Sequence, residues 1–342
     1  MTRIAPRIIG GMFGLDVAVS AERPAGAPFV QPRSFLLANA RSGIHIVLEE
    51  FRPARVWMPS YLCGAMLEAV RTTPVKFYPV DRNLSIAKFD GIGERDLVIV
   101  IDYFGFPAPT QFIDDVKSRG AWVLEDACQA LLTRGVGQHS DFVLFSPRKF
   151  LGVPDGGILT SRGGSSLNDV HLEAAPPDWV LKAFEAVLLR REFDLYGDER
   201  RWFALFQQIE RECPVGYFEM SGLAKMLLFH AFDYAAIAQR RRDNYLSLNQ
   251  RLAGIALFPD LPSGVVPLGF PVRLEARDRV REALFAAQIY PPIHWPIADI
   301  VPEQFAESHQ LNREMLTLPC DQRYDSSDMD RMAEIILQIV GR

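Results

Sequence analysis

The amino-acid sequence predicts an α/β protein that has a large, mainly parallel sheet and a smaller C-terminal α+β domain. Short apolar segments alternate with helical patterns between about residues 41 and 160, and strands separated by such helices usually pair in parallel. The run Leu97–Ile101 is apolar at every position, as in a strand that is covered on both faces. From residue 178 the chain turns mostly helical, and it ends in a second strand-and-helix unit.

Six short apolar segments are the predicted strands of the large domain: Arg55–Met58, Val75–Val80, Leu97–Ile101, Trp122–Leu124, Phe142–Phe145 and Gly157–Thr160. Helical patterns before or between them cover 41–51, 61–72 and 110–119, and Gly120 ends the last of these.

The remaining segments complete the predicted organisation. Residues 222–252 indicate one long helix or a broken pair, Val265–Leu274 a strand and 276–287 a helix. A last helix is expected to begin near Ser327, with Asp330 as its capping-box partner. We therefore expect an N-terminal lead-in at 1–34, irregular where it is rich in Pro, Ala and Gly, a large domain at 35–220, and a helical linker with a small C-terminal domain at 221–342.

Composition excludes several classes of protein. The net charge of −5 does not favour nucleic acid as a partner. The four cysteines stand alone and the six histidines are scattered, so we expect a reducing compartment and no metal site. The apolar stretch Ile8–Val19 is too short for a membrane span and lacks a convincing cleavage site. We expect a cytoplasmic protein without a membrane partner. The glycines do not form the G-x-G-x-x-G pattern of a dinucleotide site.

The candidate functional residues follow two of the predicted strands. Asp126 and Gln129 come after Trp122–Leu124, and Ser146 and Lys149 come after Phe142–Phe145. Ligands of open parallel sheets bind at the carboxyl ends of the strands. We therefore expect these four side chains to share one site.

This set of side chains matches the needs of pyridoxal 5′-phosphate. Its aldehyde requires a lysine amine, here Lys149, and we expect partial desolvation to suppress the charge of that amine. Its ring nitrogen requires a carboxylate, here Asp126. Its phosphate requires a hydroxyl such as Ser146 and the amides of a helix N-terminus, which the helix near Ala40-Arg41 can supply. Taken singly, each residue is more often a surface lysine, a helix cap or a turn residue.

Together these residues resemble the DegT/StrS sugar aminotransferases, a branch of the fold-type I pyridoxal phosphate enzymes. The family has an E-D-x-x-Q segment and a lysine loop K-x-x-x-x-x-[ED]-G-G, which appear here as Glu125–Gln129 and as Lys149 followed by Asp155-Gly156-Gly157. The likeness extends over about 35–342. Asn39-Ala40-Arg41 falls at the family's phosphate turn, and Pro59-Ser60-Tyr61 at its P-S-[FY] segment.

The resemblance implies a role for each candidate. Lys149 would carry the cofactor as a Schiff base, Asp126 would face the pyridine nitrogen, and Gln129 would contact the ring or its 3-hydroxyl. Ser146 would bind the phosphate with the amides of Ala40 and Arg41. Further positions complete the comparison: Cys63 at the ring-stacking aromatic, Tyr61 and His294 as substrate contacts, Asp102 at the family histidine, and Tyr217 and Glu219 at the polar positions of its partner-subunit segment.

The predicted function is therefore that of an aminotransferase which binds pyridoxal 5′-phosphate and aminates a keto sugar, expected to be nucleotide-linked, for polysaccharide or natural-product assembly. The resemblance also implies a homodimer and glutamate as the amino donor. Two alternatives stay open. One is another pyridoxal phosphate reaction on the same fold, such as a dehydratase or lyase reaction. The other is a non-catalytic regulatory or binding homologue.

Overall fold

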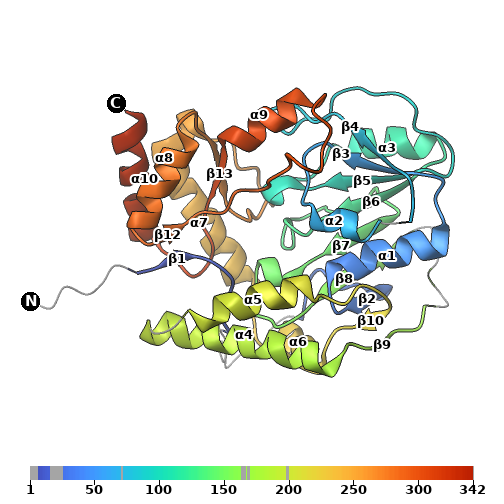
Figure 1. The fold of residues 1–342 in the computed structure, drawn as a ribbon, viewed down its shortest axis with the longest axis horizontal. Helices are drawn as coiled ribbons and strands as arrows, with labels where there is room; N and C mark the ends of the chain where they lie inside the picture. The colour runs from blue at the N-terminus through green and yellow to red at the C-terminus, as the bar shows by residue number, and fades with distance from the viewer. Residues whose placement is uncertain are drawn as a thin grey trace, which may run out of the picture.

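A mixed sheet of nine strands forms the centre of the large domain in the part of the chain that the computed structural model describes, residues 7–15, 26–70, 72–162, 167, 170–197 and 200–341 (Figure 1). Its strand order is β4-β3-β5-β6-β7-β8-β2-β10-β9. The bounds are Ser34–Leu37 for β2, Val56–Pro59 for β3, Val75–Tyr78 for β4, Leu97–Ile101 for β5, Trp122–Asp126 for β6, Phe142–Phe145 for β7, Gly157–Ser161 for β8, Glu173–Ala174 for β9 and Phe218–Glu219 for β10.

The predicted fold class is confirmed by the pairing within this sheet. Strands β4, β3, β5, β6 and β7 pair in parallel, and all five residues of β5 are buried, as its apolar sequence predicts. Strand β8 is antiparallel to β7, and β2 is antiparallel to β8. The short strands β2, β9 and β10 have no clear alternation of apolar and polar residues, and the sequence did not predict them.

The first six α-helices of the described residues are α1, α2, α3, α4, α5 and α6, with bounds Ala40–Phe51, Ala65–Glu68, Thr110–Ser118, Pro177–Tyr196, Arg201–Arg211 and Gly222–His230. The helix predicted over 61–72 is wrong in length, because only the four residues of α2 are helical. Tyr61 and Leu62 bury their side chains completely ahead of this turn. Pro74 then disfavours helical backbone in the residue before it.

The C-terminal unit consists of α7 at Tyr234–Leu252, β11 at Phe270–Arg273, α8 at Arg277–Ala286, β12 at Ile289–Tyr290, α9 at Ala306–Glu314, β13 at Met315–Leu318 and α10 at Ser326–Val340. The alternative of a broken helix pair over 222–252 is the observed one, since α6 and α7 are separate. Strand β11 pairs antiparallel with β13 and is shorter than the predicted Val265–Leu274. Strand β1 at Ile9–Gly10 comes from the predicted lead-in and pairs in parallel with β12.

The start of the last helix differs from the predicted one by two residues. Asp325 is the N-cap, and it forms a capping box with Asp328. The sequence also offers Ser327 with Asp330 at the same spacing. Because Asp and Ser cap helices about equally well, local sequence alone did not decide between the two overlapping boxes.

A fully buried arginine joins α7 to the turn after β7. Arg241 donates to the carbonyl oxygens of Pro267 at 3.1 Å, Leu268 at 3.1 Å and Phe150 at 3.4 Å, and its guanidinium lies 4.2 Å from the centre of the Phe150 ring. Burial lowers the pKa of Arg241 to about 10, so the group stays charged at neutral pH.

In the described residues no helix is long and apolar enough to cross a membrane.

The start of α1 lies directly against Gly157 at the start of β8. A methyl group on Gly157 would come 2.3 Å from the carbonyl carbon of Asn39 and 2.5 Å from the nitrogen of Ala40. Both contacts are with backbone, which cannot move aside as a flexible side chain would. The glycine therefore sets how closely the N-terminus of α1 approaches the strand ends.

We predict that Gly157→Ala lowers the free energy of unfolding by about 2–3 kcal/mol through overpacking. Gly222→Ala is the matched control, because no heavy atom lies within 4 Å of the added methyl group, and we expect it to change stability little. Urea denaturation followed by circular dichroism measures both. A Gly157→Ala variant as stable as the wild type would contradict the close packing.

Candidate active site

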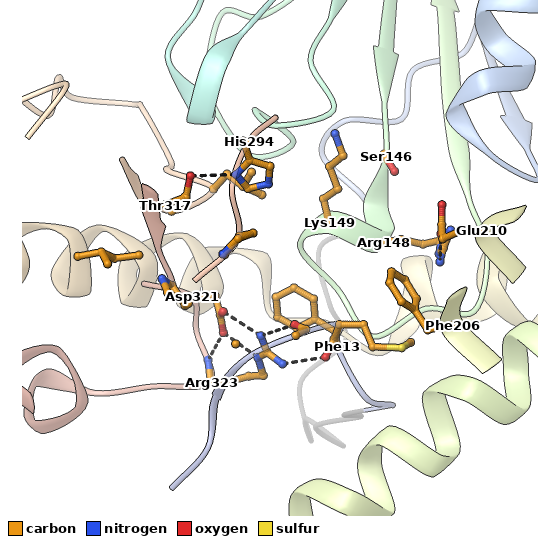
Figure 2. A pocket seen from close by; sticks show the side chains of 18 residues that line it. Phe13, Ser146, Arg148, Lys149, Phe206, Glu210, His294, Thr317, Asp321 and Arg323 are labelled. Carbon is orange, nitrogen blue, oxygen red and sulfur yellow. Dashed lines mark hydrogen bonds and ion pairs between the residues drawn. The ribbon is translucent and has the colours of Figure 1, made fainter. Parts of the chain in front are cut away.

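Lys149 lies in a short 3-10 turn, η2, at Pro147–Lys149, directly after β7. Its N–H donates to the carbonyl oxygen of Ser146 at 3.2 Å, and Pro147 opens the turn, where its missing N–H costs nothing. Figure 2 shows Ser146 and Lys149 as neighbours at the end of β7, with His294 on the other side of the lysine. These residues line a cavity of about 340 Å³.

Asp126 is the last residue of the neighbouring strand β6 and is 7% exposed. Its Cα is paired with that of Leu144 across the parallel ladder, so the ends of β6 and β7 are adjacent. The Asp126 carboxylate accepts the N–H of Cys128 at 3.0 Å. Lys149 and Asp126 thus come from adjacent strand ends, as predicted, and each is close enough to influence the other electrostatically. Their placement at opposite ends of one cofactor ring stays a prediction.

The electrostatics of Lys149 combine two opposing influences. Burial acts to lower the pKa of its amine, but the neighbouring groups Cys128, Asp126, Cys63 and Glu210 outweigh burial, and the pKa is raised. Burial also raises the pKa values of both thiols, so they are neutral at pH 7. The carboxylates of Asp126 and Glu210 are then the charges that stabilise the protonated amine. Desolvation thus disfavours the charge of this amine, as expected, while the nearby carboxylates oppose it.

Gln129 follows β6 and is almost completely buried. Its Oε1 accepts the N–H of Phe104 at 2.7 Å, whereas its Nε2 is buried without a hydrogen-bond partner among the described residues. A buried amide donor without an acceptor costs free energy. A polar group on a bound molecule would satisfy this donor, which fits the predicted contact between Gln129 and the cofactor ring.

The predicted phosphate end of the site lies at the start of α1. Asn39 caps the helix by accepting the N–H of Ser42 at 3.0 Å, and Arg41, in the first turn, has no intrahelical acceptor for its own N–H. Asn39 forms a bridge with Gly156 of the lysine loop, and Gly157 allows the close approach of Ala40 described above. The roles of Ser146 and of the Ala40 and Arg41 amides toward a phosphate stay predictions.

Cys63, the predicted ring-face residue, is partly buried. Burial raises the pKa of its thiol, the charges of Lys149 and Arg41 lower it, and Asp126 raises it. These influences mean that Cys63 lies in the same electrostatic environment as the lysine and the carboxylate.

The two predicted substrate residues have different environments. His294 lines the cavity, and its Nδ1 lies 2.9 Å from Thr317 Oγ1. Burial, together with the positive charge of Lys149, lowers the pKa of His294 to about 3, so the imidazole is neutral at physiological pH. Tyr61 is fully buried and donates its hydroxyl to the carbonyl oxygen of His294. The Tyr61 hydroxyl therefore binds the backbone of His294.

Residues at the departures from the family pattern are engaged within the protein. Tyr217 donates to Glu50 at 2.7 Å, and Glu219 pairs with Lys225 at 2.6 Å. Asp102, after β5, is fully buried; its Oδ1 accepts the N–H of Ala108 at 2.7 Å.

Sequence reasoning missed the wall of the cavity that the N-terminal segment forms. Gly10, Gly11, Met12 and Phe13 line it, and Arg323 holds this segment by donating to the carbonyl oxygen of Met12 at 2.9 Å and by stacking on Phe13 at 4.1 Å. No local signal links residues about 310 positions apart. Arg148 and Glu210 also line the cavity and form an ion pair of 2.7 Å.

The fold and the site together define a protein with the architecture of the fold-type I aminotransferases. Residues 91–337 match the model of the DegT/DnrJ/EryC1/StrS aminotransferase family. The chain belongs to this family, which confirms the predicted family and enzyme class.

Three relatives illustrate the similarity. The UDP-N-acetyl-3-dehydro-α-D-glucosamine 3-aminotransferase of Acidithiobacillus ferrooxidans is 26% identical over 327 aligned residues, which cover 82% of this chain and 76% of that protein. The structure of DesI in the presence of its TDP-sugar product has 18% identity and a TM-score of 0.65, covering 90% of this chain and 81% of DesI. NtdA from Bacillus subtilis, solved with bound cofactor PMP, has 14% identity and a TM-score of 0.67, covering 90% and 73%.

The buried carboxyl of Asp102 leads to a prediction about pH. Burial raises its pKa well above the usual range, and the neighbouring Glu125 raises it further. Its Oδ2 has no hydrogen-bond partner among the described residues. The folded protein therefore keeps a proton on Asp102 that the unfolded chain releases above about pH 4, so this group makes the wild type less stable as pH rises.

We predict that Asp102→Asn removes this pH-dependent loss and makes the protein about 1 kcal/mol more stable than the wild type at pH 8. At pH 5 the two proteins should differ less. Urea denaturation at both pH values measures the effect, and Asp299→Asn, at an exposed position, is the control. A larger deficit of Asp102→Asn at pH 8 than at pH 5 would refute a protonated Asp102.

Proposed function

We propose that this protein is a pyridoxal 5′-phosphate-dependent aminotransferase that transfers an amino group to the keto group of a nucleotide-linked sugar, with glutamate as the amino donor. The observation that carries the proposal is that Asp126 ends β6 while Lys149, which lines the cavity, directly follows the neighbouring strand β7. Membership of the aminotransferase family supports the reaction class. The relatives whose names specify UDP- and TDP-linked sugars support the substrate class.

The residues present fit the cofactor. When bound, pyridoxal 5′-phosphate supplies an aldehyde for the amine and a ring that withdraws electrons from the carbon losing its proton. Asp126 would hold a proton on the ring nitrogen, and the free Nε2 of Gln129 would donate to an oxygen on the ring. Ser146 and the first turn of α1 would bind the phosphate.

Lys149 would then move the proton. Its amine would act as general base toward the carbon that loses a proton, and then as general acid. The carboxylates of Asp126 and Glu210 act to raise the pKa of this amine, so the free amine would accept a proton readily. Neutral His294, on the other side of Lys149, would offer a hydrogen bond to substrate oxygens without adding charge.

We predict that Lys149→Ala abolishes a lysine-dependent visible absorbance band and lowers the rate of amino transfer from glutamate at least about 10³-fold. Borohydride reduction should abolish the visible band of the wild-type protein with added pyridoxal 5′-phosphate and leave the cofactor attached to Lys149 through a secondary amine that resists dialysis. Lys117→Ala is the control, because Lys117 forms a surface ion pair with Asp141.

The outcome also separates the alternatives. A wild-type protein without a lysine-dependent band would be a non-catalytic homologue. A band without amino transfer, but with loss of water or ammonia from the substrate, would indicate a dehydratase or lyase.

The proposal includes a homodimer in the cytoplasm. Four unpaired cysteines, at positions 63, 128, 213 and 320, fit a reducing compartment.

Helix α4 presents Leu181, Leu188 and Leu195 at seven-residue spacing, and they are 64%, 42% and 56% exposed. Residues two helical turns apart lie on one face, and exposed apolar rows mark interaction surfaces. A second copy of the chain would cover this row.

We predict that Leu188→Glu converts a dimer into a monomer, because dimerisation would bury the introduced charge without a partner. Light scattering after gel filtration should give the wild type twice the mass of one chain and the variant the mass of one. Leu337→Glu on α10 is the control, since Leu337 is similarly exposed at 39%. A monomeric wild type would end the proposal of a dimer, and a dimeric Leu188→Glu would exclude this face.

A further inference from the structure

Two arginines share one glutamate beside Lys149. The Arg148 guanidinium lies 2.7 Å from Oε1 of Glu210, and the Arg41 guanidinium lies 3.3 Å from Oε2. One carboxylate thus bridges a residue of the lysine turn and a residue of the first turn of α1. Figure 2 shows Arg148 and Glu210 together at the edge of the cavity, close to Ser146.

The side chains of the two arginines are less exposed to solvent than that of the glutamate. The side chains of Arg41 and Arg148 are 13% and 15% exposed, whereas that of Glu210 is 39% exposed. Arg41 has further partners, since it donates to Glu68 at 2.8 Å and to the backbone carbonyl oxygen of Glu210 at 3.2 Å. The Glu210 carboxylate can therefore leave while Arg41 keeps its other hydrogen bonds.

The helix that carries Glu210 does not favour a carboxylate at this position. Glu210 lies in the last turn of α5, where the helix dipole is negative and repels a negative charge. Burial raises the pKa of Glu210, but Arg148 and Arg41 outweigh burial and lower it. The anion is therefore stabilised by the two guanidinium groups and not by its own helix.

We propose that Arg41 and Arg148 form a binding site for a phosphate monoester and that Glu210 occupies this site until the phosphate displaces it. The inference rests on the proposed function, because the phosphate we assign to the site is that of the cofactor. Arg148 directly precedes Lys149 and Arg41 lies in the helix turn next to Gly156–Gly157. Lys149, Arg148 and Glu210 line the same cavity, so a cofactor joined to Lys149 would place its phosphate in this region.

The charges favour exchange over coexistence. A phosphate monoester carries about −1.5 to −2 charge at pH 7, so a phosphate and Glu210 together would bring nearly three negative charges to two guanidinium groups. Arg41 already shares its charge with Glu68. Repulsion between the phosphate and Glu210 would then oppose binding. Replacement of the carboxylate by the phosphate keeps the opposite charges close to balance.

Titration of the full-length protein with pyridoxal 5′-phosphate, followed by the visible band, tests this inference. We expect Glu210→Gln to lower the Kd about tenfold, because the competing anion is gone, and Arg148→Gln to raise it at least about tenfold. Glu212→Gln is the matched control, because Glu212 lies next to the same helix end and pairs with Lys182 at 2.8 Å. The Kd of this variant for pyridoxal 5′-phosphate should equal that of the wild type. Pyridoxal, which lacks the phosphate, reports the effect of Glu210 on the Lys149 amine alone, and Glu210→Gln should strengthen its binding about tenfold less than that of pyridoxal 5′-phosphate.

Each other outcome overturns a specific part. A weaker Kd in Glu210→Gln would make Glu210 a member of the loaded site, and an unchanged Kd would exclude competition. A change confined to inhibition by UDP would assign the site to the diphosphate of the substrate. If no variant forms a band, the proposed function fails, and inorganic phosphate still tests the anion site: it should raise the melting temperature of Glu210→Gln more than that of the wild type. Equal shifts would overturn the inference.

Discussion

The parallel pairing of β6 with β7 is the constraint on which the site depends. It fixes Asp126 opposite Leu144, so that the residues following both strands emerge at one edge of the sheet. The proline-led turn after β7 then directs Lys149 into the cavity. Neither side chain needs a long loop to reach the other. The buried, fully apolar strand β5 supports β6 from its other side, so the position of the carboxylate is set by the core of the protein.

The strand ends of this sheet are rich in acid. Asp102 follows β5, and Glu125 and Asp126 end β6, all buried. Arg148 and Arg41 supply positive charge at the other end of the site, where Glu210 now binds them. Because Asp102 keeps its proton, the Asp126 carboxylate supplies the negative charge near the sheet, and the two arginines make the region near the start of α1 positive. A molecule with a basic ring nitrogen and an anionic tail is complementary to this distribution of charge.

Much of this arrangement is predictable from the sequence because it is local. The strand Leu97–Ile101 agrees residue for residue with its prediction, and strand ends followed by Asp126 or Lys149 identify the site. What escapes prediction depends on distant contacts. The raised pKa of Lys149 reflects Cys128, Asp126, Cys63 and Glu210, which come from separate segments of the chain. The N-terminal wall of the cavity needs Arg323 to hold Met12. The short helix α2 follows the buried Tyr61, and local helix propensity contains no information about that burial.

The buried guanidinium of Arg241 has a consequence for motion. It reaches from α7 to the carbonyl oxygen of Phe150, the residue directly after Lys149, and Gln322 donates to the same oxygen at 2.6 Å. Two segments of the C-terminal unit are thus attached to the backbone that carries the reactive nitrogen. Rotation of that unit against the sheet must either break these buried bonds or carry the lysine backbone along. A rotation that keeps these hydrogen bonds would therefore displace Lys149 together with the C-terminal unit.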